Sequence, residues 1–315
     1  MFASIDRCWV CDGVQLARFH RCRMEFSEYA DQDRELHAYT GQGIWFVRCR
    51  RCGFGQPERL PTLPRFFDRM YNQRWAEDWV DHEFDAPYKD LIFRGLLRSL
   101  DARTAPARRT LLDVGAHAGR FMYLAQRRGW TVEGVELNPR TAACAARRTG
   151  APVHRLNAHS LAGRGRRYAA VTLTDVLEHI PNPVQVLETI RELLEPGGII
   201  AVKVPNGPGQ WAKERTLASV SSHRVSLAEN LVHVNHFSPR SLEWALGRAG
   251  FEQVSVRTGA PEMIPLRPSF IRPAISNTLR LVVYAAGNLP GALHTPLALN
   301  LQAYGRTTGR AASNS

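Results

Sequence analysis

The sequence lacks the features of a membrane-spanning or secreted chain. Its apolar runs are far shorter than the roughly 20 residues that a helix needs to cross a bilayer, so we expect no spanning helix. The opening stretch, MFASIDRCWVCDG, has no long apolar segment of the kind that a secretory signal contains. We therefore expect a cytoplasmic protein in which the six cysteines are mostly reduced.

Lysine is scarce: of the 41 lysines and arginines, only Lys89, Lys203 and Lys213 are lysines. The net charge of +12 therefore comes from arginines, which are scattered or form short pairs such as Arg108–Arg109. Such a skew is typical of GC-rich codon usage rather than of selection for phosphate contacts. The composition thus argues against nucleic acid as the partner, although a general attraction to anions remains.

The chain is long enough for one large domain and a smaller one. Residues 1–56 carry two CxxC pairs, and residues 57–108 are predicted to form a helical linker or lid region. Residues 109–258 alternate short β-rich runs with helical patterns, which indicates βαβ units and a parallel sheet. Residues 259–315 add an apolar helix and one last strand, LALNLQAYGR, after the run FEQVSVRTG.

A glycine turn follows the first β-rich run of the large domain, in RTLLDVGAHAGRFMYL. A dinucleotide-binding turn needs a middle glycine so that the backbone can approach a pyrophosphate, but His117 stands in that place between Gly115 and Gly119. A P-loop is excluded because no Gly-Lys-Ser/Thr follows. The turn therefore suits a ligand without phosphate, and Asp113 at the end of the strand could hold an ammonium group directly or through water.

The next strand ends in GVELN, which places an acidic residue seventeen positions after the second glycine. Glu136 can accept hydrogen bonds from two ribose hydroxyls, as acidic residues do at this point of nucleoside-binding folds. A ribose, an ammonium group and no phosphate describe S-adenosylmethionine (SAM). NAD is the alternative ligand.

Residues 109–258 resemble a class I SAM-dependent methyltransferase through LLDVGAHAGRF, GVELN, TLTDVLEHIPNP, LLEPGGIIAVKVPN and HFSPRSLEWALGRAGFEQVSV, in that order. The resemblance implies an α/β, Rossmann-like sheet of seven strands in the order 3-2-1-4-5-7-6, with strand seven antiparallel. It also implies a set of cofactor-binding residues: Asp113, Val114, Gly115, Ala116, Gly119, Phe121, Glu136, Leu137, Asn138, Asn157, Ala158, Asp175 and Val176.

Two positions depart from the pattern of that family. Asn157 stands where the family often has an aspartate that binds the adenine amino group, and an amide oxygen can still accept that hydrogen bond. Tyr168-Ala169 replaces the frequent Phe-Asp at the start of strand four.

Four of the cysteines form the pairs CWVC and CRRC, which contain Cys8, Cys11, Cys49 and Cys52. Zinc takes four soft ligands in a tetrahedron, and two CxxC turns brought together supply them. The alternatives are redox pairs or disulfides, which a reducing compartment and the lack of a thioredoxin-like βαβ unit disfavour. We therefore predict a closed structural Zn²⁺ site that contributes to folding rather than to chemistry.

A four-cysteine module before such a core resembles the nucleotide-sugar C-methyltransferases and related bacterial enzymes of small-molecule and glycan pathways. Those enzymes carry a Tyr-His-Glu-His-Phe-Ser type of stretch, whereas this chain has HVNHFS and keeps only the second histidine and the Phe-Ser. The loss puts C-methylation of ketosugars in doubt. The resemblance still implies a small or carrier-linked substrate, most plausibly a sugar or a related hydroxylated compound.

Three histidines are candidates for the base that methyl transfer often requires, because a pKa near neutrality suits that role. His236 is preferred, since the family places its segment over the methyl group, followed by His233 and then His179 in DVLEHI. Each could instead make structural hydrogen bonds or bind substrate. Glu178 and His179, with Asp175 nearby, could alternatively bind a divalent cation, as in some quinone O-methyltransferases with a similar segment.

Two further stretches each allow a structural interpretation, as packing, and a functional one. The aromatic series Tyr71, Trp75 and Trp79 has helical spacing, which favours packing between domains over a substrate lid. The apolar helix around TLRLVVYAAGNLPGAL is expected to pack on the sheet or in a homodimer, with peripheral membrane contact as the alternative. For the whole chain, an RNA methyltransferase and a scaffold without catalysis are the alternatives to a metabolite methyltransferase.

Overall fold

The structure is a computed structural model, and it describes residues 1–73, 84–85, 87–161, 165–220, 229–265 and 271–308. Two of the three residues of the aromatic series, Trp75 and Trp79, for which packing between domains was favoured over a lid, lie outside these residues.

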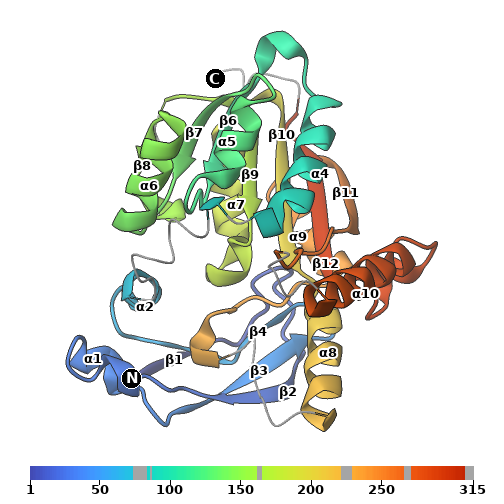
Figure 1. Cartoon of the computed structure of the whole chain (residues 1–315). Coiled ribbons are helices and arrows are strands. Elements are labelled where there is room, and N and C mark those ends of the chain that lie inside the picture. The colour runs from blue at the N-terminus through green and yellow to red at the C-terminus, as the bar shows by residue number, and fades with distance from the viewer. Residues whose placement is uncertain (74–83, 86, 162–164, 221–228, 266–270, 309–315) are drawn as a thin grey trace.

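The central feature is a sheet of seven strands in the order β11-β12-β10-β9-β6-β7-β8 (Figure 1). Only β12 runs antiparallel, to both of its neighbours β10 and β11. This order confirms the predicted sequence of strands 3-2-1-4-5-7-6 with an antiparallel strand seven. The strands are β6 (Thr110–Val114), β7 (Thr131–Val135), β8 (Val153–His154), β9 (Tyr168–Thr174), β10 (Leu194–Pro205), β11 (Glu252–Thr258) and β12 (Asn300–Arg306).

Helices cover both faces of this sheet, because successive residues of the buried strands point to opposite sides. Leu112, Val114, Val171 and Val202 pack in one hydrophobic cluster with α7 (Pro183–Glu192) and α9 (Pro239–Arg248). Leu111, Ala170 and Ala201 pack in a second cluster with α4 (Asp90–Asp101) and α5 (Arg120–Gln126). The remaining helices are α1 (Arg34–His37), α2 (Phe66–Gln73), α6 (Pro139–Thr149), α8 (Gly207–Val220) and α10 (Ile271–Gly287).

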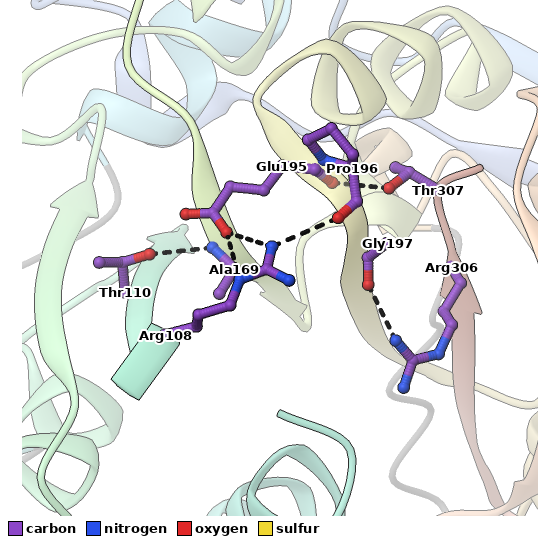
Figure 2. Close-up of polar contacts among 8 residues, drawn as sticks. All are labelled: Arg108, Thr110, Ala169, Glu195, Pro196, Gly197, Arg306 and Thr307. Atoms are coloured by element: carbon purple, nitrogen blue, oxygen red, sulfur yellow. Dashed lines mark hydrogen bonds and ion pairs between the residues drawn. The ribbon is translucent and has the colours of Figure 1, made fainter. Parts of the chain in front are cut away.

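The amino-terminal ends of the parallel strands are tied together by polar contacts (Figure 2). Arg108 Nε donates to Glu195 Oε2 at 3.0 Å, and Thr307 Oγ1 donates to the Glu195 carbonyl at 2.7 Å. Arg306 Nη1 donates to the carbonyl of Gly197 at 2.9 Å, and this glycine turn interrupts the pairing of β10 with β9. These contacts occupy the amino-terminal edge of the sheet. Ligands are therefore expected at the opposite edge, at the carboxyl ends of the strands.

The N-terminal part of the chain forms two small sheets next to the carboxyl end of the large one (Figure 1). Strands β2 (Leu16–Arg23), β3 (Gly43–Cys49) and β4 (Gly55–Pro57) make an antiparallel sheet. Strand β1 (Phe2–Ser4) pairs with β5 (Arg59–Pro61), so strand pairing in this part continues past residue 56. The four CxxC cysteines share the hydrophobic cluster of α7 and α9, so the N-terminal part packs directly on the large sheet.

Short 3₁₀ helices connect the larger elements: η1 (Ser27–Tyr29), η2 (Pro87–Lys89), η3 (Pro106–Arg108), η4 (Ala158–Leu161), η5 (Leu177–His179), η6 (Glu229–Leu231) and η7 (Ala292–His294). No helix within the described ranges combines the length and the apolar character needed to cross a membrane.

Candidate functional site

A cavity of about 1100 Å³ lies at the carboxyl ends of β6, β9 and β10. Its walls come from the glycine turn, from the loop after β9, from α8 and α10, and from the segment around His233. Tyr71 of α2 also lines it, so the one lid aromatic that the structure describes does face this space. The cavity therefore lies between the large sheet and the segments that connect it to the N-terminal sheets.

The two glycines of the turn are required by packing. Gly115 has a φ of +78°, and a Cβ there would lie 2.2 Å from Cγ2 of Val176. Gly119 begins α5 with a φ of +86°, and its Cβ would lie 2.8 Å from Cα of Ala145. Because only glycine adopts these conformations without strain, the spacing seen in the sequence follows from the turn itself.

Asp113 is a buried carboxylate at the floor of the cavity. Thr172 Oγ1 donates a hydrogen bond to Asp113 Oδ1 at 2.7 Å. Burial raises the pKa of Asp113 to about 7, with a further contribution from nearby Glu136. A cationic group in the cavity would stabilise the ionised form of Asp113.

Glu136 is buried directly behind the turn rather than in the wall of the cavity. Its Oε2 accepts the backbone N–H of His117 at 2.9 Å, and its Oε1 accepts that of Asn138 at 2.9 Å. Burial raises the pKa of this carboxyl as well. Glu136 therefore contacts the backbone of the turn, and His117 is the residue that separates it from the cavity.

The predicted cofactor residues divide into two groups. Those that line the cavity are Asp113, Gly115, Ala116, Phe121, Asp175 and Val176. Those that lie outside its wall are Val114, Gly119, Glu136, Leu137, Asn138, Asn157 and Ala158. In the second group, the Asn138 side chain caps α6, and the Asn157 amide donates to Asp68 Oδ1 of α2 at 2.8 Å.

All three lysines of the chain line this one cavity. Lys203 is buried and forms an ion pair with Asp175, and Lys89 Nζ lies 3.1 Å from the other oxygen of that carboxylate. Burial alone would raise the pKa of Asp175, but the two lysines hold it well below its usual range. Lys213 is exposed, and it has no ion pair with any residue that the structure describes. The scarcity of lysine in the sequence gives no sign that these three residues meet in one place.

Glu178, His179 and His233 bring one ligand atom each to within 4.8 Å of one another. His179 Nδ1 is 2.6 Å from the carbonyl oxygen of Val232, and the two imidazole rings are 4.8 Å apart between centroids. Neither carboxylate oxygen of the buried Glu178 has a hydrogen-bond partner in the described part of the chain. Burial, together with the charge of Asp175, raises the pKa of Glu178 to about 8. Burial lowers the pKa of His233 well below its usual value, with help from His179.

His236, the first choice for a base, does not line the cavity. Its ring lies against Phe46 and Trp211, at 4.9 Å from each ring centroid, and its backbone pairs with Gly55 of β4. Burial lowers the pKa of this imidazole to about 3. The order of the three histidines therefore needs correction: His233 and His179 face the cavity, whereas docking of the N-terminal sheet encloses His236.

The four CxxC cysteines meet in one buried cluster, with all four thiols unbridged. Cys8 Sγ is 3.6 Å from Cys52 Sγ, and Cys11 Sγ is 3.5 Å from Cys49 Sγ. Four sulfurs that each lie about 2.3 Å from a zinc ion in a tetrahedron are about 3.8 Å apart. The arrangement of these cysteines therefore fits a zinc ion.

Comparison with known proteins gives matches to methyltransferases. A family model described as a methyltransferase domain matches residues 80–256. A ubiquinone biosynthesis O-methyltransferase of Caulobacter vibrioides is 35% identical over 229 residues, which cover 71% of this chain and 73% of that protein. A protein of the same name from Cereibacter sphaeroides is 34% identical over 101 residues, 30% of this chain and only 41% of its own length.

Among solved structures, the complex between the Haloferax volcanii Trm112 methyltransferase activator and a methyltransferase aligns with a TM-score of 0.53. The identity is 15%, and the alignment covers 74% of this chain and 97% of the matched chain. At that identity the likeness concerns the fold.

Proposed function

This chain belongs to the SAM-dependent methyltransferases, and from that membership we propose that it methylates a hydroxyl group of a small or carrier-linked metabolite. The acceptor we favour is a sugar, a glycan or a related hydroxylated compound. The observation that carries the proposal is the cavity itself, which combines the glycine turn and Asp113 with His233 and Glu178.

The cavity fits SAM as cofactor at its methionine end. When bound, SAM supplies a methyl carbon that the sulfonium group activates for displacement. Asp113 offers a buried carboxylate to the ammonium group, and Gly115 leaves the turn free of a side chain. Glu136 lies behind the turn, where its Oε2 accepts the backbone N–H of His117, and we assign the ribose hydroxyls to its carboxylate.

The chain must also align the acceptor hydroxyl and accept its proton. We assign this second role to His233, because it lines the cavity and, as a neutral imidazole, has one ring nitrogen that can accept a proton. Burial lowers the pKa of His233, which makes it a weaker base than a free histidine, so its position in the cavity carries the assignment. A ring nitrogen of His233 would take the hydroxyl proton, and the methyl carbon would exchange its bond to the sulfonium sulfur for a bond to the acceptor oxygen. Lys213, which is not neutralised by a described carboxylate, would contact an acidic group on the acceptor.

A second candidate is a cation-assisted transfer to a phenol with two neighbouring oxygens. The unpartnered carboxylate of Glu178 beside two imidazoles fits a divalent cation, which Glu178, His179 and His233 would hold. The name of the Caulobacter relative supports this acceptor class. Asp175, the third residue in the sequence hypothesis, is engaged by Lys89 and Lys203 instead.

Methyl transfer from SAM to a panel of nucleotide sugars, lipid-linked glycans and prenylated catechols tests both candidates. We expect His233→Asn to lower kcat by about 10²-fold or more on the true acceptor, with His236→Asn as the matched variant outside the cavity. A magnesium titration of desalted protein separates the two. If activity strictly requires the cation and is lost in Glu178→Gln, the result would favour the phenol as the acceptor. It would also overturn the role of His233 as a base.

We further propose that Cys8, Cys11, Cys49 and Cys52 hold a structural zinc ion. The support is the distance between the sulfurs and their burial in the cluster shared with α7 and α9.

An RNA methyltransferase remains the alternative enzyme. Salt-sensitive binding of RNA to the purified protein would favour it, and absence of binding at low salt would remove it.

A further inference from the structure

Helix α10 carries an uncovered apolar face. The exposed fractions of Ile275, Leu279 and Val282 lie between 58% and 65%. Their spacings of four and three residues place these side chains on one face of the helix, and Leu289, in the turn after the helix, is also 63% exposed. A large side chain exposed singly is ordinary, but a row of three on one helical face indicates an interaction surface.

Helix α10 itself carries charge of one sign only. No aspartate or glutamate occurs in the sequence after Glu262, and α10 contains the arginines Arg272 and Arg280. An apolar stripe beside arginines is the pattern of helices that lie in the surface of an anionic bilayer. A second copy of the chain fits less well, because a twofold contact between two α10 helices would bring these arginines together and neither helix has an acidic residue.

The apolar face continues into the cavity. Leu279 belongs to the exposed row and also lines the cavity, and Leu297 is likewise both exposed and part of the wall. Ser276, Arg280 and Val283 of the same helix line the cavity next to them. In Figure 1, α10 projects sideways from the body of the protein, beside the start of α8. The exposed row therefore continues into the wall of the cavity through Leu279 and Leu297, where Ser276 and Arg280 add polar groups.

We propose that this face of α10 docks on an anionic bilayer surface, so that an acceptor carried by a lipid enters the cavity past Leu279 and Leu297. The inference rests on the proposed function, because it identifies the carrier-linked acceptor as a lipid-borne one. Docking is peripheral: the side chains of the row sit among the headgroups and upper acyl chains, and the exposed Arg272 contacts anionic headgroups, whereas Arg280 lines the cavity.

Flotation of the full-length, zinc-loaded protein with vesicles tests this docking. We expect binding to phosphatidylcholine vesicles that contain phosphatidylglycerol, and weaker binding to phosphatidylcholine alone. Ile275→Asp combined with Val282→Asp should lower the partition coefficient by about tenfold or more, because two apolar side chains leave the bilayer and two repelled charges replace them. Neither residue lines the cavity, so SAM binding should be unchanged.

The matched control for each single substitution is Val14→Asp, which adds one carboxylate, as Val282→Asp alone does, at a valine that is 64% exposed in the N-terminal part of the chain. It should bind vesicles almost as the unmodified protein does. The docking would be overturned if the α10 variant bound vesicles as strongly as the unmodified protein does. It would also be overturned if the unmodified protein bound no vesicles at low salt. A dimer in light scattering that Ile275→Asp dissociates would assign the face to a second copy instead. SAM titration of the same samples distinguishes failure of the docking from failure of the proposed function. Loss of vesicle binding alone removes the docking, whereas failure to bind SAM also removes the proposed function.

Discussion

The buried carboxylate of Asp113 should make SAM binding depend on pH. Burial raises its pKa from 3.8 to about 7 in the protein without ligand. The ammonium group of the cofactor favours the ionised form, so binding must displace a proton wherever Asp113 is protonated. With a pKa of about 7, the ionised fraction rises from about one tenth at pH 6 to about nine tenths at pH 8. The affinity for SAM should therefore rise about tenfold over that interval.

The same shift predicts the stability of the protein without ligand. A carboxyl whose pKa is raised by folding stabilises the fold at low pH, and this contribution is lost as the pH rises toward the folded pKa. The difference between 3.8 and about 7 corresponds to about 4 kcal/mol, an upper bound for a single buried group. The melting temperature should thus fall between about pH 4 and pH 7, and the loss should be smaller in Asp113→Asn.

Titration calorimetry with SAM between pH 6 and pH 8 is the assay. Asp113→Asn keeps the size of the side chain and can still accept the hydrogen bond from Thr172, but it carries no charge. We expect weaker binding and a flat pH dependence in this variant. A flat dependence in the unmodified protein, or a tenfold change that survives in Asp113→Asn, would refute the reasoning.

Three further predictions concern the turn, the cysteines and the lysines. Gly115→Ala should weaken SAM binding by about tenfold or more in calorimetry, whereas Gly197→Ala, also at positive φ but with open space around it, should not. Cys8→Ser should lower the zinc content. It should also lower the melting temperature of the whole protein, because the cysteines share a core cluster with α7 and α9, whereas Cys22→Ser should keep the zinc. Lys213→Ala should raise KM for an acidic acceptor without changing the affinity for SAM, and an unchanged KM would remove its proposed contact.

Much of the fold was predictable because local rules and tertiary structure agree. The alternation of β-rich and helical runs indicated the parallel sheet, and the confirmed strand order was implied by the resemblance to class I methyltransferases. Gly115 and Gly119 stand at backbone conformations that other residues rarely adopt, which explains why the turn was visible in one sequence. The CxxC spacing likewise led to the four cysteines that meet in the structure.

The wall of the cavity was less predictable, because distant segments build it. Lys89 precedes the large sheet, Lys203 lies in β10 and Lys213 in α8, so no local pattern joins them. The side chain of His236 could not be oriented from its motif, because its surroundings depend on the pairing with Gly55, more than 150 positions earlier. His233, three residues before it, faces the cavity instead.

Titration calorimetry shows whether the cavity binds SAM. Purified protein, assayed for zinc in the same sample, is titrated with SAM and separately with NADH. We expect micromolar binding of SAM, about one zinc per chain, and no binding of NADH. Failure of folded, zinc-loaded protein to bind SAM, or binding of NADH in its place, would contradict this expectation.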